Sequence, residues 1–169
     1  KKKQFEDNQE VKDLLMKRKR VIHKAQGKYT VFMDIIDELV AKKKTKYCFV
    51  YVPEGVDYSS GNEEHILEKM QGLVYDKYPQ IHTNSFVGGD SSKKDKLRAF
   101  SEGKIDMLFA MKCLDEGVDI PRTEVGIFTS STGNPRQFIQ RRGRLLRIHP
   151  DKTFAYIFDT IVVPRFNYG

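Results

Sequence analysis

The residues best suited to chemistry form one short basic stretch, QRRGRLLR, at positions 140–147. Across 136–147 there are five arginines and no acidic residue, so nothing inside the segment neutralises the charge. A guanidinium group is a rigid fork of N–H donors that matches the oxygens of a phosphate. The stretch is therefore either a phosphate-binding site or a solvated basic face that pairs with acids elsewhere, and its composition leaves both interpretations open.

An Asn-Pro pair just before this stretch predicts the start of a helix over 135–147. At 100° per residue, Gln140, Arg144 and Arg147 share one face of that helix, and Arg136 joins it one turn earlier. An arginine that stabilises the transition state of phosphoryl transfer can raise the rate by roughly 10³–10⁵. The shared face is therefore the part of the helix best suited to a phosphate.

The remaining positions of this helix are expected to serve its packing and its surface rather than to bind phosphate. Arg142 projects near the apolar side, where we expect its side chain to reach out to the surface or to pair with an acid. Gly143 costs about 1 kcal/mol relative to Ala in a helix interior, so it indicates close approach of another backbone or of a ligand. The face expected to pack on a sheet consists of Phe138, Ile139, Leu145 and Leu146.

A second polar segment, AMKCLDEGVDIP at 110–121, follows directly from an apolar run that predicts a buried strand. A carboxylate such as Asp119 at the carboxyl end of a strand could accept hydrogen bonds from a ribose. The same composition suits an ordinary acidic turn closed by Pro121, so this segment alone decides little. Its polar turn contains Asp115, Glu116, Gly117 and Asp119, and the glycine allows tight backbone geometry.

Helical and strand patterns alternate along the chain and must position these two segments. Ser92, with Asp95 three residues later, predicts the start of one helix, and Gly103 predicts its end. The alternation predicts an α/β domain whose mostly parallel central sheet has about five or more strands, with ligands at their carboxyl ends. Helices are expected at 11–25, 29–40, 66–78, 92–103 and 135–147, strands at 46–52, 81–87, 105–111, 124–130 and 153–159, and a loop at 55–64.

The composition is that of one domain with a single core and a basic surface. The chain has 169 residues, is 39% hydrophobic and carries a formal charge of +7, which suits a polyanionic partner. Its two cysteines, Cys48 and Cys113, lie in hydrophobic surroundings and are expected to be buried thiols, which favours a reducing, cytoplasmic location. No apolar run is long enough for a membrane span, so no membrane partner is expected.

Several other features are explained by ordinary structural roles. The four histidines, His23, His65, His82 and His149, show no metal-ligand spacing, so no metal site is expected within this chain. Tyr47, Tyr51, Phe109 and Phe128 are expected in the core rather than as platforms for stacking bases. The lysine-rich amino end is either a solvated face or a contact with nucleic acid. Because the chain begins with KKK and no initiator Met, we expect a fragment of a longer polypeptide.

Taken together, DEGVDIP and QRRGRLLR resemble motifs V and VI of superfamily 2 helicases and translocases. Other segments resemble the same family in the same order, and they cover nearly the whole chain: RKRVIHKAQGKYTVFMDIIDEL, KYCFVYV, FVGGDSSKKDKLRAFSEGKIDMLFAMK and TFAYIFDTIVVP. The EG-x-D-I-P form is similar to that of restriction-enzyme motor subunits and excision-repair DNA helicases. DEAD-box RNA helicases usually carry a basic residue where Glu116 stands, so the resemblance favours DNA over RNA.

The resemblance implies a RecA-like, three-layer domain that is the second of two motor domains. In this family the two domains enclose ATP with Mg²⁺, and nucleic acid crosses both. Arg144 and Arg147 match the arginine fingers, and Gln140 matches the residue that helps sense the nucleotide state. Asp119 matches the acid near the ribose. Besides the two arginines, the positions that match cofactor contacts are Glu116, Gly117 and Asp119.

The resemblance also implies contacts with the backbone of nucleic acid. Backbone amides suit this role, because they bind phosphate without reading sequence. One position departs from the pattern, since many relatives carry a Thr or Ser hydroxyl where this chain has Met111. Lys112 or a backbone N–H could supply that contact instead. The matching residues are Gly88, Gly89, Asp90, Ser91, Ser92, Met111 and Lys112.

Two motifs of this family are missing from the chain, namely the G-x-x-x-x-G-K-[ST] phosphate loop and a D-E-x-H-like magnesium motif. Both belong to the N-terminal RecA-like domain, which is the expected partner and the main holder of ATP and Mg²⁺. The chain alone is therefore expected to hydrolyse ATP negligibly. The expected organisation is leading helices over 1–45, the motor core over 46–160 and an exit segment over 161–169.

Two other functions stay open at this point. The chain could be a non-catalytic nucleic-acid-binding module that keeps the fold but has lost the motor. It could also be an unrelated α/β protein that binds a nucleotide or a phosphorylated metabolite, in which case both motif matches would be coincidence.

Overall fold

The fold is built around a five-stranded sheet in which every neighbouring pair is parallel. The strand order is β4-β5-β1-β6-β7. The strands are β1 (Cys48–Tyr51), β4 (Thr83–Phe86), β5 (Met107–Ala110), β6 (Val125–Phe128) and β7 (Tyr156–Asp159), and each lies within a predicted range. The computed structural model describes residues 9–23, 25, 27–53, 56–57, 64–111, 120, 122–129, 139–140, 142–143, 145 and 147–163.

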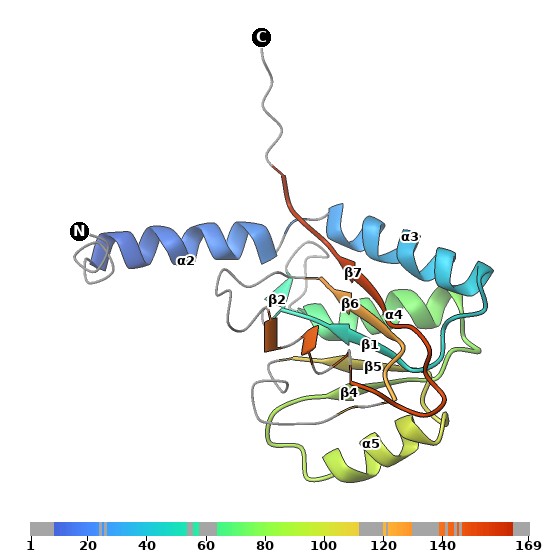
Figure 1. The fold of residues 1–169 in the computed structure, drawn as a ribbon. Helices are drawn as coiled ribbons and strands as arrows, with labels where there is room; N and C mark the ends of the chain where they lie inside the picture. The colour runs from blue at the N-terminus through green and yellow to red at the C-terminus, as the bar shows by residue number, and fades with distance from the viewer. Residues whose placement is uncertain are drawn as a thin grey trace.

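Helices cover both faces of this sheet, which gives the expected three-layer α/β architecture (Figure 1). The helices α3 (Gly27–Ala41) and α4 (Ile66–Lys77) pack on one face, and α5 (Lys93–Ser101) packs on the other. Residues 139, 140, 142, 143 and 145 are also helical, and we call the segment they mark the arginine helix. Leu145 belongs to the same core cluster as Phe100 of α5.

Alternate residues of the central strand point into two separate cores. Cys48 and Val50 pack with side chains of α3 and α4, whereas Phe49 and Tyr51 pack with Phe100 of α5. All four residues of β1 are buried, because a parallel sheet covered on both faces has no solvent side. Cys48 is the buried thiol expected from the sequence, and its burial raises the pKa of the thiol. Cys113 lies outside the described residues.

Most of the aromatic residues predicted to be structural are in these cores. Tyr51, Phe109 and Phe128 are buried, and the partly buried Tyr47 packs edge-on against Phe100.

The loop predicted at 55–64 is only partly a loop. Within it, β2 (Val56–Asp57) pairs antiparallel with β3 (Glu64–His65). Strands of two residues are too short to show the alternation of apolar and polar residues from which strands are predicted.

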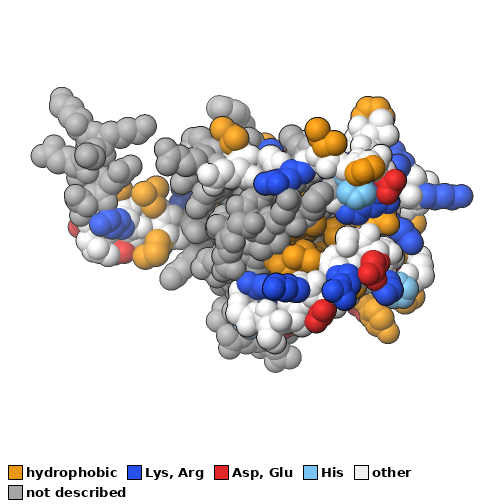
Figure 2. Space-filling model, turned by 60° about the horizontal axis from the view of Figure 1, so that its bottom comes forward, with side chains coloured by type: hydrophobic (Ala, Val, Ile, Leu, Met, Phe, Trp, Pro, Cys, Tyr) orange, Lys and Arg blue, Asp and Glu red, His pale blue; other side chains and the backbone are white. Residues whose placement is uncertain are grey.

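The first helix, α2 (Gln9–His23), extends away from the sheet and its covering helices (Figure 1). Its apolar stripe is on the surface, with 64% of Leu14 and 71% of Val21 exposed, and Figure 2 shows such apolar side chains on it. The spacing of these residues correctly predicted a helix. Among the described residues, no helix has both the length and the apolar character needed to span a membrane.

Candidate functional site

The carboxyl ends of β6 and β7 hold a cluster of charged and polar groups around Thr129. Lys28, in the first turn of α3, is 5% exposed, and its ammonium donates a hydrogen bond of 2.6 Å to the carbonyl oxygen of Thr129. The N–H and the hydroxyl of Thr129 both donate to the carbonyl of Tyr51, at 3.0 and 2.9 Å. Burial lowers the pKa of Lys28 to about 8, and the charge of Asp159 partly opposes this effect. Thr129, the last described residue before the arginine helix, is therefore held by Lys28 on one side and by Tyr51 on the other.

Arg142 joins the arginine helix to the same cluster. Its guanidinium donates a hydrogen bond of 2.5 Å to the Asp159 carboxylate, and both side chains are largely buried. The guanidinium carbon also lies 4.8 Å from the centre of the Phe128 ring, close enough for a cation–π contact. This confirms the expectation that Arg142 pairs with an acid. Its charge serves the packing of the domain itself.

The opposite side of the arginine helix is exposed. Gln140 and Gly143 are exposed positions of this helix, and Arg147 is exposed just beyond its last described helical residue, so the predicted shared face of Gln140 and Arg147 stays a prediction. Arg144, the other proposed finger, lies outside the described residues. No described atom lies within 4 Å of a Cβ built on Gly143, so the predicted approach of another backbone is wrong for the described part of the chain. Close approach of a ligand at Gly143 stays a prediction.

Leu145 anchors the arginine helix to the sheet. It is 1% exposed, and a Cβ built on Gly126 of β6 would lie 2.3 Å from one of its methyl carbons. The missing side chain of Gly126 is what lets Leu145 lie against the strand. The prediction that Ile139 packs on the sheet is wrong, since 68% of it is exposed. At 100° per residue, Ile139 lies about 120° around the helix from Leu145, and the predicted apolar face was too wide.

Lys152 holds the other end of this segment. Its ammonium donates to the carbonyl oxygens of Leu145, at 2.9 Å, and Thr123, at 3.2 Å. A lysine at the end of a helix satisfies carbonyls that have no partner within the helix and complements the helix dipole. Partial burial lowers the pKa of Lys152. The helix is thus fixed by Lys152 at its end, by Leu145 on the sheet and by Arg142 at Asp159.

The carboxyl end of β4 carries the glycine-rich loop that was predicted to bind a nucleic-acid backbone. Gly88, Gly89 and Ser91 are exposed, and Gly89 has a φ of 78°, which favours glycine. Asp90 organises the loop by accepting hydrogen bonds from the N–H of Ser92 at 2.8 Å and from its hydroxyl at 2.6 Å. Ser92 is the N-cap residue of α5 as predicted, but its hydroxyl donates to Asp90 and makes no hydrogen bond to a backbone N–H of the helix.

Lys96 fixes this loop to the strand before it. Its ammonium donates to the Asp90 carboxylate at 2.5 Å and to the carbonyl oxygen of Ser85 at 2.9 Å. The ammonium of Lys96, followed by the donors of Ser92, holds the pKa of Asp90 well below its usual range. Met111, at the end of the neighbouring strand β5, donates its N–H to the Phe86 carbonyl at 3.3 Å. The fold therefore places Met111 next to the strand that leads into the loop.

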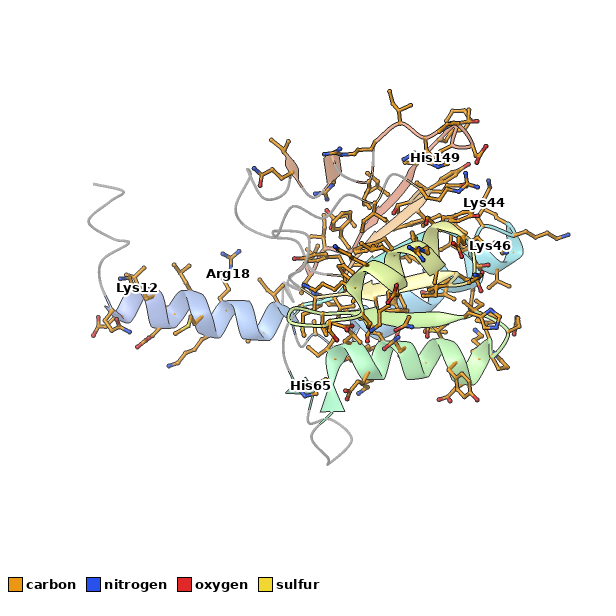
Figure 3. The ribbon with its side chains drawn as sticks, turned by 90° about the horizontal axis from the view of Figure 1, so that it is seen from below. Lys12, Arg18, Lys44, Lys46, His65 and His149 are labelled. Carbon is orange, nitrogen blue, oxygen red and sulfur yellow. The ribbon has the colours of Figure 1, made fainter. Side chains whose placement is uncertain are left out.

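Several predicted site residues cannot be placed in this way. Glu116, Gly117, Asp119 and Lys112 lie outside the described residues. Within the described ranges, no group of three or more histidines, cysteines, aspartates and glutamates could hold a metal ion. Figure 3 shows His65 and His149 far apart, at the start of α4 and near the other end of the domain.

The amino ends of the strands form a separate basic region. Lys44 and Lys46 lie there with His149, at the opposite end of the domain from Lys12 and Arg18 of α2 (Figure 3). A surface hollow of about 360 Å³ at this end is lined by residues that include Lys43, Gln80 and Asp106. Among the described residues, none of those predicted to bind nucleotide or nucleic acid lines it.

Comparison with protein families gives a match over residues 8–149 to the family described as "Helicase conserved C-terminal domain". The chain belongs to this family. The match includes both segments that resemble motifs V and VI and nearly all of the domain that carries them.

Curated relatives match the helicase C-terminal domain over a part of its length. A Dicer-like protein 2 of Aspergillus terreus is 37% identical over 68 residues, which is 40% of this chain and 5% of that protein. The DNA 3'-5' translocase XPB2 of Sulfurisphaera tokodaii is 38% identical over 55 residues, which is 32% of this chain and 12% of that protein. Each of these matches spans a small part of a much longer relative.

Solved structures support the fold. The Hef helicase domain of Pyrococcus furiosus superposes with a TM-score of 0.52 at 23% identity, over 89% of this chain and 29% of that one. Domain 2 of the DEAD-box helicase Mss116p, solved with an RNA duplex, superposes with a TM-score of 0.59 at 11% identity, over 81% of this chain and 50% of that one. The five-stranded parallel sheet flanked by helices is thus the RecA-like fold of helicase C-terminal domains.

Proposed function

We propose that this helicase C-terminal domain is the second motor domain of an ATP-dependent superfamily 2 helicase or translocase. It supplies Arg144 and Arg147 as arginine fingers to an ATP site that it shares with an N-terminal RecA-like domain. The observation that carries the proposal is the division of labour on the arginine helix. Arg142 and Leu145 hold the helix to the domain, whereas Gln140 and Arg147, on the face proposed to meet ATP, are exposed.

The donor set on that face suits the phosphates of ATP. A guanidinium is permanently charged and presents N–H donors in a planar fork, so Arg147 can bind phosphate oxygens without a change of protonation. Mg²⁺, bound with ATP, neutralises charge that develops on the phosphates during transfer. We propose that the N-terminal domain holds this ion. In the proposed site, Glu116, Gly117 and Asp119 contact the nucleotide from the motif V turn.

Substitution of the fingers in a protein that contains both motor domains tests this function. Arg144→Ala and Arg147→Ala should each lower kcat for ATP hydrolysis by about 10³-fold, since a finger acts mainly in the transition state. Arg98→Ala is the matched control, because Arg98 is an exposed arginine in the last turn of α5. Its turnover should equal that of the wild type.

Near-normal turnover in both finger variants would refute the assignment. Circular dichroism and thermal unfolding establish whether the variants keep the fold. If the wild-type protein with both domains hydrolyses no ATP under any condition, the chain is instead a nucleic-acid-binding module that has lost the motor.

For the nucleic-acid partner we propose a duplex backbone, with DNA preferred over RNA. The proposed contacts are the exposed loop at Gly88, Gly89, Ser91 and Ser92 together with the strand end at Met111 and Lys112. ATP turnover should rise more with double-stranded DNA than with double-stranded RNA of the same sequence. The stimulation should weaken as salt increases, because binding to phosphates releases counterions. Equal or greater stimulation by RNA would reverse the preference.

A further inference from the structure

Lys28 is the lysine whose surroundings are hardest to explain by packing alone. It is the one described lysine that is buried, at 5% exposure, and burying an ammonium is costly unless it is paired. Its ammonium donates a hydrogen bond to a neutral carbonyl, that of Thr129. An apolar side chain of similar length would fill the same space at lower cost. The charge of Lys28 is therefore better explained by the group that it binds, the carbonyl of Thr129, than by the packing of the core around it.

The group that Lys28 holds leads directly to the proposed fingers. Thr129 ends β6 and comes before the segment that enters the arginine helix. Lys28 is 101 residues earlier in the chain, so the bond ties the start of α3 to this strand end across the sheet. The carbonyl of Thr129 is bound by Lys28, while its N–H and hydroxyl bind Tyr51.

Asp159 extends this link to the arginine helix itself. The charge of Asp159 acts on Lys28, and its carboxylate accepts the hydrogen bond of Arg142. Arg142 lies only two residues before Arg144 and five before Arg147 in the sequence. Lys28 and Arg142 thus approach Asp159 from different layers of the fold, one from α3 and the other from the arginine helix.

We propose that Lys28 is a positioning residue for the arginine fingers. It fixes the carboxyl ends of β6 and β7, through Thr129 and Asp159, in the arrangement on which Arg142 and its helix rest. The inference depends on the proposed function, because its effect is on ATP turnover. Displacement of a reacting group by about 1 Å can lower a rate by about 10²-fold, so a small shift of the helix is enough.

The test compares Lys28→Met with Lys44→Met in the protein that contains both motor domains. Lys44 is an exposed lysine near the amino end of β1, and its substitution should leave kcat unchanged. Lys28→Met should lower kcat by about 10-fold to 100-fold and change KM for ATP by less than about twofold, because fingers act mainly in the transition state. Its thermal unfolding should match that of the wild type closely, since a buried charge has been replaced by an apolar chain.

A second measurement separates positioning from general damage. In the background of Arg147→Ala, Lys28→Met should lower kcat further by a clearly smaller factor than it does in the wild type, because one of the two fingers through which it acts is already missing. A structural role would instead give the full additional loss in that background. Asp159→Asn, which keeps an acceptor for Arg142 but removes the charge near Lys28, should reproduce the loss of kcat and serves if Lys28→Met does not fold.

Three outcomes would overturn the inference: wild-type kcat in Lys28→Met, a full additive loss in the Arg147→Ala background, or wild-type kcat in Asp159→Asn. Each is distinct from failure of the proposed function. If Arg144→Ala and Arg147→Ala keep normal turnover, the fingers themselves are refuted. If they lose turnover while Lys28→Met does not, only the role of Lys28 is refuted.

Discussion

At each end of strands β6 and β7, an arginine lies over an aromatic ring and pairs with an aspartate. At the amino end, Arg122 lies 4.2 Å from the Tyr47 ring centre and bonds Asp151 at 2.6 Å, but 69% of the Asp151 side chain is exposed. At the carboxyl end, Arg142 makes the equivalent contacts with Phe128 and with Asp159, whose side chain is 22% exposed. The two arginine side chains are equally buried, at 16% exposure, so the two pairs differ in the exposure of their aspartates.

A lysine accompanies each pair and widens the difference. At the amino end the partly buried Lys152 binds the carbonyls of Leu145 and Thr123, whereas at the carboxyl end the buried Lys28 binds the carbonyl of Thr129. Charges out of water interact strongly and are costly to leave unpaired, while exposed pairs contribute little. The amino end therefore holds a helix end in place, and the carboxyl end adds an electrostatic network that is sensitive to single charges.

The largest difference is expected when the acid of each pair is removed. Asp159→Ala leaves Arg142 and Lys28 without their shared counter-charge and should lower the free energy of unfolding by about 3 kcal/mol. Asp151→Ala at the exposed end should lower it by less than about 1 kcal/mol. Urea unfolding of the two variants measures both values. Equal losses would mean that burial does not distinguish the two ends.

The pH dependence of stability should distinguish the two lysines. A lysine with a lowered pKa in the folded chain binds its proton more weakly there than in the unfolded chain, so stability rises with pH between the two pKa values. For Lys28 the two values are about 8 and 10.5. From about pH 7 to about pH 9.5, the wild type should gain about 2 kcal/mol relative to Lys28→Met. The same comparison with Lys152→Met should give a smaller gain of the same sign, and the absence of any gain for Lys28 would contradict its burial as a cation.

The sequence predicted much of the architecture, because the signals for it are local. Apolar runs such as KYCFVYV predicted buried parallel strands, and the three-and-four spacing of apolar residues predicted the helices. The pairing of Arg142 was also predictable, since helical geometry fixes the direction of its side chain relative to the apolar face. The burial of Ile139 was predicted wrongly, because residues at the edge of an apolar face can lie on either side of it.

The contacts at the carboxyl ends of β6 and β7 could not be predicted, because they join residues far apart in sequence. Lys28 in GKYT looks like an ordinary surface lysine at the start of a helix, and its burial depends on a strand end about 100 residues later. Asp159 looks like the polar end of a strand. Only the strand order, which puts β7 beside β6, places its carboxylate near both Arg142 and Lys28.

Two glycines offer a test of how closely the arginine helix must be held between these ends. A methyl group on Gly126 would lie 2.3 Å from Leu145, so Gly126→Ala should lower the free energy of unfolding by about 1–3 kcal/mol and move the helix. Urea unfolding measures the first effect. ATP turnover in the protein with both motor domains measures the second, and unchanged turnover despite lost stability would show that the fingers tolerate the shift.

The smallest effect should come from the other glycine, and its sign should be reversed. Gly143 is helical, exposed and surrounded by open space, so Gly143→Ala should raise the free energy of unfolding by about 0.5–1 kcal/mol, since alanine favours the helix. If ATP approaches the backbone at Gly143, as the sequence suggested, the same variant should lose turnover while it gains stability. Packing within the described chain does not require glycine at this position. A gain in stability with unchanged turnover would therefore show that ATP binding does not require it either, and would exclude that approach.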